Sequence, residues 1–271
     1  MCQMFIITAD KVIDISEKLK SFFHKSSIHK HGWGYADFSD DKVFIKRENM
    51  PAYKSAAAQA MADGHFEVKN AFFHLRYATI GAVEQENVHP FVKSDNSGRV
   101  WTIIHNGTIF RSGATDRFFH SQAGSTDTER LLLYIVECVN RSMTERKSGL
   151  CGQERFDLVE KILISLASDG NKLNVALYDG EFFYIHANSR SGSRALGKAC
   201  RKDFLYELDD NGAKFFATSP LDFSLWRPIE LNSVSAYQNG RLIRKSAAPH
   251  IYEYFENYED VMHLYQGFSQ L

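Results

Sequence analysis

The chain has 271 residues, with 32 basic and 33 acidic side chains and a formal net charge of -1. Because binding to nucleic acid or to an anionic membrane surface draws on a basic excess, this balance argues against both partners. No apolar run approaches the ~20 residues that span a bilayer, and the start lacks the basic and apolar regions of a secretory signal. We therefore expect a cytoplasmic protein. Its four cysteines lie far apart, which indicates neither a zinc site nor a disulfide framework.

The first half of the chain predicts strands separated by short helices. Gly64 marks the end of one helix, and Asn106-Gly107 is expected to halt the last strand. Apolar strands are expected over residues 3–9, 32–38, 43–46, 70–79 and 100–105, and helices over residues 13–23 and 52–63.

The second half predicts two long helices followed by strands. The helices are expected over residues 126–139 and 156–167, and the hairpin turns at Asp179-Gly180 and Asn239-Gly240. The tyrosine-rich tail, residues 252–265, is expected to pack on the main body. Strands are expected over residues 173–178, 181–187, 214–218, 233–238 and 241–243. No linker divides the chain, so we expect one α+β domain over residues 1–271.

Cys2 is the most informative residue for chemistry. Initiator methionine is usually removed before a small residue, and removal of Met1 would place a thiol and a free α-amine on Cys2. A thiol has a pKa of ~8.5 and an α-amine one of ~7.7–8.0, so the amine can accept the thiol proton. A nucleophile and its base would then share one residue. The alternative is that Cys2 is only a small apolar residue at the start of a buried strand.

Three further polar clusters lie at the ends of predicted apolar strands. They are residues 74–79 (His-Leu-Arg-Tyr-Ala-Thr), which precede His89-Pro90, residues 105–108 (His-Asn-Gly-Thr) and residues 124–129 (Gly-Ser-Thr-Asp-Thr-Glu).

Each cluster also has an ordinary structural interpretation. Arg76 would suit a surface salt bridge, and Asn106-Gly107 would suit a hairpin turn. Asp127 would suit the first turn of a helix, where an acidic side chain is favourable. His89 would order a loop, and Trp33 would fill the core.

Taken in order, the motifs resemble those of the class II glutamine amidotransferases, which are N-terminal-nucleophile hydrolases. The family pattern is Cys after the initiator Met, then Arg-x-Ala-Thr, His-Pro, His-Asn-Gly and Thr-Asp, and all five elements occur here in that order. The resemblance is sharp over residues 2–128 and diffuse over residues 174–243. His29 with Gly32-Trp33-Gly34 resembles the stand-alone branch of the family. The resemblance implies a four-layer αββα sandwich of two antiparallel sheets, with the active site at one end.

The resemblance also implies catalytic roles. Cys2 would attack the side-chain amide of glutamine and form a γ-glutamyl thioester. Asn106 and the Gly107 backbone N–H would stabilise the oxyanion, and loss of one such donor typically lowers the rate ~10²–10³-fold. No cofactor is implied.

Four residues would bind the substrate. Arg76 would hold the α-carboxylate of glutamine with Thr79 nearby, since a guanidinium is a two-pronged donor. Asp127 would bind the α-ammonium group, and His89 would support the site. A metal site is not expected, because His24, His29 and His31 have no carboxylate or cysteine partner at ligand spacing.

Three departures from the family pattern leave the substrate open. His31 stands where the stand-alone branch usually has Asp, Ile80 where some relatives have His, and Ser219 where Glu is common. One hypothesis is a glutaminase that supplies ammonia to a separate acceptor protein. A second is a stand-alone hydrolase of larger γ-glutamyl amides. A third is a catalytically silent binding domain of the same fold.

Overall fold

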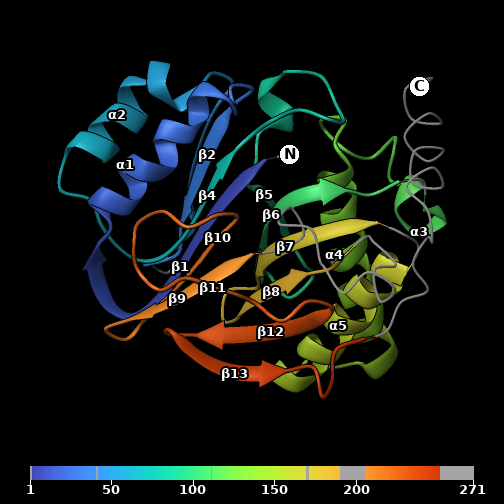
Figure 1. The fold of residues 1–271 in the computed structure, drawn as a ribbon. Helices are drawn as coiled ribbons and strands as arrows, with labels where there is room; N and C mark the ends of the chain where they lie inside the picture. Colours follow the sequence, from blue (N-terminus) through green and yellow to red (C-terminus); the bar gives the residue numbers. More distant parts are fainter. Residues whose placement is uncertain (1, 41, 111, 169–170, 190–204, 251–271) are drawn as a thin grey trace, which may run out of the picture.

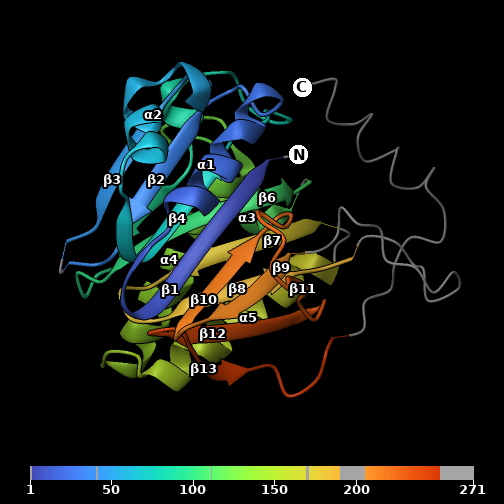
Figure 2. The same ribbon diagram turned by 60° about the vertical axis from the view of Figure 1, so that its left-hand side comes forward.

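Two antiparallel sheets stack face to face and carry helices on their outer sides (Figures 1 and 2). The computed structural model describes residues 2–40, 42–110, 112–168, 171–189 and 205–250. The predicted tail packing of residues 252–265 lies outside this part of the chain.

The first sheet has the strand order β11-β9-β10-β1-β4-β2-β3. Its strands are β1 (Gln3–Asp14), β2 (Trp33–Asp37), β3 (Phe44–Glu48), β4 (Glu67–Leu75), β9 (Tyr206–Asp210), β10 (Ala213–Ala217) and β11 (Arg227–Pro228). Two helices cover its outer face, α1 (Ser16–His24) and α2 (Ala56–Asp63) (Figure 1).

The second sheet has the order β13-β12-β8-β7-β6-β5. Its strands are β5 (Phe91–Ser94), β6 (Val100–Thr108), β7 (Lys172–Tyr178), β8 (Phe183–Ala187), β12 (Ser233–Gln238) and β13 (Arg241–Lys245). Its outer face is covered by α4 (Asp127–Arg146) and α5 (Gly152–Ser168). The short elements are α3 (Gly113–Asp116) and the 3₁₀ turns Lys25–Ser27, Ala52–Lys54 and Gln85–Asn87.

Side-chain alternation along the strands separates three apolar layers. On β1, Phe5 and Ile7 pack under α1 and α2, whereas Met4 and Ile6 point into the space between the sheets. On β6, Ile103 packs against the helices of the second sheet, and Ile104 faces the first sheet. Helix, sheet, sheet and helix therefore stack as four layers, which confirms the predicted α+β sandwich.

Several boundaries differ from those predicted. The expected turn at Asn106-Gly107 is wrong, because β6 continues through both residues and pairs them with β7. The single helix expected over residues 52–63 is divided by Ser55, whose side chain caps α2 by accepting from the Ala58 N–H at 3.1 Å. The hairpin at Asn239-Gly240 is confirmed, with positive φ at both residues.

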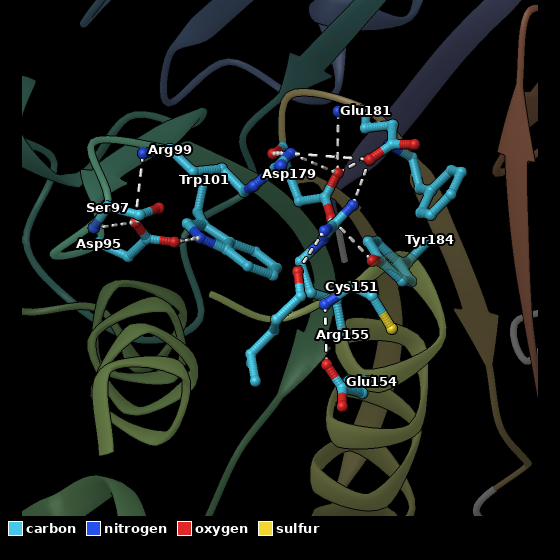
Figure 3. A network of polar contacts seen from close by, with 12 residues as sticks. Asp95, Ser97, Arg99, Trp101, Cys151, Glu154, Arg155, Asp179, Glu181 and Tyr184 are labelled. Atoms are coloured by element: carbon cyan, nitrogen blue, oxygen red, sulfur yellow. Dashed lines mark hydrogen bonds and ion pairs between the residues drawn. The ribbon is translucent and has the colours of Figure 1, made fainter. Parts of the chain in front are cut away.

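The turn between β7 and β8 is fixed by a buried ionic network (Figure 3). Arg155 on α5 donates to Asp179 at 2.6 Å and also pairs with Glu181. The Tyr184 hydroxyl donates to the same Asp179 carboxylate at 2.8 Å, and the carboxylate also accepts from two backbone N–H groups of the turn. This network anchors α5 to the end of β7 that is remote from Asn106.

Candidate active site

Cys2 directly precedes β1 and lies on the same side as Met4, facing the space between the sheets. Its sulfur accepts a hydrogen bond from the Tyr77 N–H at 3.3 Å. Burial raises the pKa of the Cys2 thiol; the Tyr77 backbone and the Arg76 guanidinium lower it, and the Asp127 carboxylate raises it further. The sulfur is therefore within electrostatic reach of both charged residues that the motifs predicted around it.

Arg76 follows β4 and organises the loop after it. The side chain is buried, at 2% exposure, which makes the surface salt-bridge interpretation wrong. Its guanidinium donates to the carbonyl oxygens of Ile80 at 3.1 Å, Gly81 at 3.1 Å and Ala82 at 2.9 Å. A planar five-donor group suits such a cluster of acceptors, and burial lowers the pKa of Arg76.

Asp127 is the first residue of α4 and is tied to the end of β6. Its carboxylate accepts from the Ile109 N–H at 2.7 Å and from the Thr128 N–H at 2.9 Å. The Thr128 hydroxyl lies 3.0 Å from Nδ1 of His105. The predicted position in the first turn of a helix is confirmed, and the carboxylate is held there by backbone donors.

Asn106 and Gly107 approach the site from the second sheet. Asn106 is fully buried, and its amide has no hydrogen-bond partner among the described residues. A Cβ at position 107 would lie 1.9 Å from the Lys172 carbonyl oxygen, so glycine is required by close strand packing. His74 on β4 bridges the sheets at this end, with Nε2 3.2 Å from the His105 carbonyl oxygen. Because His74 pairs with Met4, Cys2 and Asn106 lie at the same end of the sandwich.

Thr79 and His89 are less directly placed. Thr79 is exposed on the loop after β4. His89 is buried, and its ring stacks on His74 with centroids 4.1 Å apart. Burial keeps the pKa of His89 well below its ordinary value, so the ring is neutral. In the described part of the chain, neither residue is hydrogen bonded to Cys2.

Two residues that depart from the family pattern, His31 and Ser219, and the motif residue Trp33 also have defined places. Nδ1 of His31 accepts from the Ala78 N–H at 2.9 Å, so this histidine supports the loop that carries Arg76. Trp33 is fully buried against Phe23, as the core interpretation predicted. Ser219 accepts from the Lys25 ammonium group at 2.7 Å.

Sequence reasoning missed Asn87, which joins the two loops of the site. Its Nδ2 donates to the Ala82 carbonyl oxygen and to the Ser125 hydroxyl, both at 3.0 Å. Its Oδ1 accepts from the Ser125 N–H at 2.7 Å. Asn87 thus connects the loop held by Arg76 to the residues that lead into Asp127. Its place two residues before His89-Pro90 was the available signal.

The described part of the chain shows neither a metal site nor a membrane-spanning helix. It contains no group of three or more His, Cys, Asp or Glu side chains that could hold a metal ion. None of its helices is long and apolar enough to cross a membrane.

Solved structures of two other proteins have the same fold as this chain. Glutamine phosphoribosylpyrophosphate amidotransferase of Bacillus subtilis matches 90% of this chain with a TM-score of 0.62 at 16% identity, and the match spans 49% of that longer chain. A predicted glutamine amidotransferase of Pseudomonas aeruginosa matches 90% of this chain and all of its own length, with a TM-score of 0.56 at 16% identity. Both structures therefore share the two-sheet sandwich fold of this chain.

The family model for class II glutamine amidotransferases matches residues 1–253, and the chain belongs to this family. A Haemophilus influenzae protein that is provisionally named a glutamine amidotransferase is 28% identical to this chain. The match covers 80% of this chain and 72% of the relative's length. An uncharacterized protein of Methanocaldococcus jannaschii is 26% identical over 90% of this chain and 71% of its own.

Proposed function

We propose that this chain is a cytoplasmic single-domain glutaminase in which Cys2, exposed by removal of Met1, attacks the side-chain amide of glutamine. The proposal rests on the position of the Cys2 sulfur, which accepts a hydrogen bond from the Tyr77 N–H. The charges of Arg76 and Asp127 both shift the pKa of its thiol, in opposite directions. Opposite charges near a thiol suit a substrate with a carboxylate and an ammonium group at one end.

The raised pKa of the Cys2 thiol sets the first chemical requirement. The thiol is protonated at neutral pH, so attack needs a base beside it. The α-amine of a processed Cys2 would supply that base. The sulfur bonds to the amide carbon while its proton passes to the α-amine and then to the leaving nitrogen. The C–N bond breaks and ammonia departs. Water then adds to the thioester carbon, the C–S bond breaks, and glutamate and the thiol are restored.

The oxyanion of each tetrahedral intermediate needs donors that are already in place. In this proposal Asn106 Nδ2 and the Gly107 N–H supply them from the second sheet. The buried amide of Asn106, without a partner among the described residues, is consistent with a donor reserved for the substrate. Arg76 would bind the α-carboxylate, with Thr79 at the loop edge and His89 as support behind His74. Asp127 would bind the α-ammonium group.

A panel of γ-glutamyl amides tests the proposal. Ammonia or amine release is measured with glutamine and with γ-glutamyl amides that have larger leaving groups. The proposal expects glutamine to have the highest kcat/KM, with ammonia passed to a separate acceptor protein in the cell. A preference for the larger amides would identify the alternative γ-glutamyl amide hydrolase. No turnover of any member by the processed protein would identify a silent binding domain.

A further inference from the structure

Two asparagine side chains lie side by side between the sheets. Asn106 on β6 is directly opposite Asn174 on β7 in the strand register. Ile104 and Ala176, two residues along each strand, belong to the apolar layer between the sheets, so both amides project toward the first sheet. Opposite residues of antiparallel strands have Cβ atoms ~4.5–5.5 Å apart, which is within reach of two amide groups.

Both amides are buried without a partner. Asn106 and Asn174 are each fully buried, and no described residue hydrogen bonds to the Nδ2 or Oδ1 atom of either one. An unpaired buried amide is destabilising, whereas two apolar residues here would carry no such penalty. Each amide therefore needs a partner, and rotation about the side-chain bonds or one buried water lets the two amides serve each other.

We propose that Asn174 is a positioning residue that orients the Asn106 amide for catalysis. Its Nδ2 donates to Oδ1 of Asn106, directly or through one water, and this turns Nδ2 of Asn106 toward the Cys2 sulfur. The inference rests on the proposed function, in which Asn106 is the oxyanion donor. An amide has a donating and an accepting end, so a reversed Asn106 would present an oxygen to the oxyanion and oppose the reaction.

The nearby histidine on the first sheet cannot replace Asn174 in this task. His74 Nε2 lies 3.2 Å from the His105 carbonyl oxygen and must carry a proton to bond to it. Burial lowers the pKa of His74 to about 3, so the ring is neutral and its Nδ1 is an acceptor only. An acceptor cannot hold Oδ1 of Asn106.

A double-mutant cycle on kcat tests the assignment. We expect Asn174→Leu to lower kcat for glutamine by ~10–100-fold while KM stays within ~3-fold, since a misdirected donor harms the transition state more than substrate binding. In the Asn106→Ala background the same substitution should change kcat no further. Thr102→Val is the matched control, because Thr102 is a buried β6 residue on the same face, ~13 Å along the strand from Asn106. It should leave kcat unchanged.

The pH dependence of kcat in Asn174→Asp separates a positioning role from a merely structural one. A protonated Asp carboxyl can donate to Oδ1 of Asn106, whereas an ionised one would attract Nδ2 away from Cys2. The kcat of this variant relative to the wild type should therefore rise as the pH falls. A flat ratio, an unchanged kcat in Asn174→Leu, or a loss that adds in full to that of Asn106→Ala would overturn the assignment.

The failure of the proposed function gives a different result. If Asn106→Ala keeps the wild-type kcat, the oxyanion role of Asn106 is wrong whatever Asn174 does. A high-resolution crystal structure of the processed protein is independent of turnover. It should show Asn174 Nδ2 bonded to Asn106 Oδ1, directly or through one water; two amides bonded to other groups would refute the inference.

Discussion

At the residue scale, the site is organised mainly by backbone groups. The Cys2 sulfur is held by the Tyr77 N–H, Arg76 is bound to three carbonyl oxygens, and the Asp127 carboxylate is bound to two N–H groups. Hydrogen bonds of this kind fix side chains whose charges would otherwise attract water. The sequence motifs marked the charged residues, but the backbone partners belong to loops whose conformation no motif describes.

In the proposed function, Asn87 sets the spacing of the groups that would bind glutamine. We expect Asn87→Ala to raise the KM for glutamine by about tenfold, the equivalent of ~1.4 kcal/mol, because the loops that carry Arg76 and Asp127 lose their common anchor. The kcat should change little, since the hydrogen bonds of Asn87 go to Ala82 and Ser125 and not to Cys2. Steady-state kinetics and calorimetric titration with glutamate measure both effects.

Asn49→Ala is the matched control for this variant. Asn49 is exposed, and its amide donates to the Val83 carbonyl oxygen at 3.0 Å from the outer side of the same loop. Its KM should equal that of the wild type. If Asn87→Ala instead lowers kcat at constant KM, Asn87 acts on the chemistry and not on substrate binding.

At the scale of elements, the strands with clear apolar patterns were predicted, as was the polar β13 after the turn at Asn239-Gly240, whereas β5, β9 and β11 were not. β6 and β7 were found from their apolar runs, although the motif at Asn106-Gly107 wrongly indicated a turn. β9 has the sequence Tyr-Glu-Leu-Asp-Asp and lies between β10 and the short β11, so it shows little of the apolar pattern on which prediction depends. β5 was also missed, because its four residues are too few to show an apolar pattern.

In the candidate site, too, only the residues that carry a sequence signal were predicted. Cys2, Arg76, Asn106, Gly107 and Asp127 could be named because they form an ordered set of motifs at strand ends. The pairing of Asn106 with Asn174 could not be found, because the two residues are 68 positions apart and meet only through strand register. The partners of Arg76 were hidden for a related reason, since a backbone carbonyl carries no sequence signal.

The ionic network on α5 predicts a large effect on stability. Arg155→Met would remove the closer of two cations from the fully buried Asp179 carboxylate, since Arg99 lies farther away at 3.9 Å; we expect the free energy of unfolding to fall by about 3 kcal/mol. Denaturation by urea measures the change. Arg146→Met removes an arginine that pairs with Glu154 at the surface of the same helix pair, and it should have little effect. An equal fall in the free energy of unfolding in both variants would show that the buried network stabilises the fold no more than the surface ion pair does.

At the scale of the whole molecule, neutral histidines lie in the interior of the sandwich. Burial lowers the pKa of His74 to about 3 and that of His186 to about 4, and it keeps the pKa of His89 well below its ordinary value. In the unfolded chain these rings titrate near pH ~6.5. Below that pH the unfolded state binds more protons than the folded state, so the free energy of unfolding falls as the pH falls.

The loss should begin near pH 6.5 and continue toward pH 4, where carboxylates also start to titrate. Each buried histidine contributes up to ~1.4 kcal/mol per pH unit in this window. Urea denaturation between pH 7 and pH 5 measures the slope. His186→Asn should reduce this slope by about the contribution of one buried histidine. The matched exchange at the exposed His120, His120→Asn, should leave the slope unchanged. A wild-type stability that is constant over this range would contradict the neutral interior.

The central claim is tested most directly by labelling with a diazo ketone analogue of glutamine, followed by peptide mapping in a mass spectrometer. The proposed function predicts a single adduct on Cys2, on a peptide that lacks Met1 and has a free α-amine, and excess glutamine should prevent it. Cys138 and Cys151 serve as internal controls, one buried and one exposed. An adduct on either of them with Cys2 unmodified, or a fully processed protein that the analogue does not label, would contradict the claim.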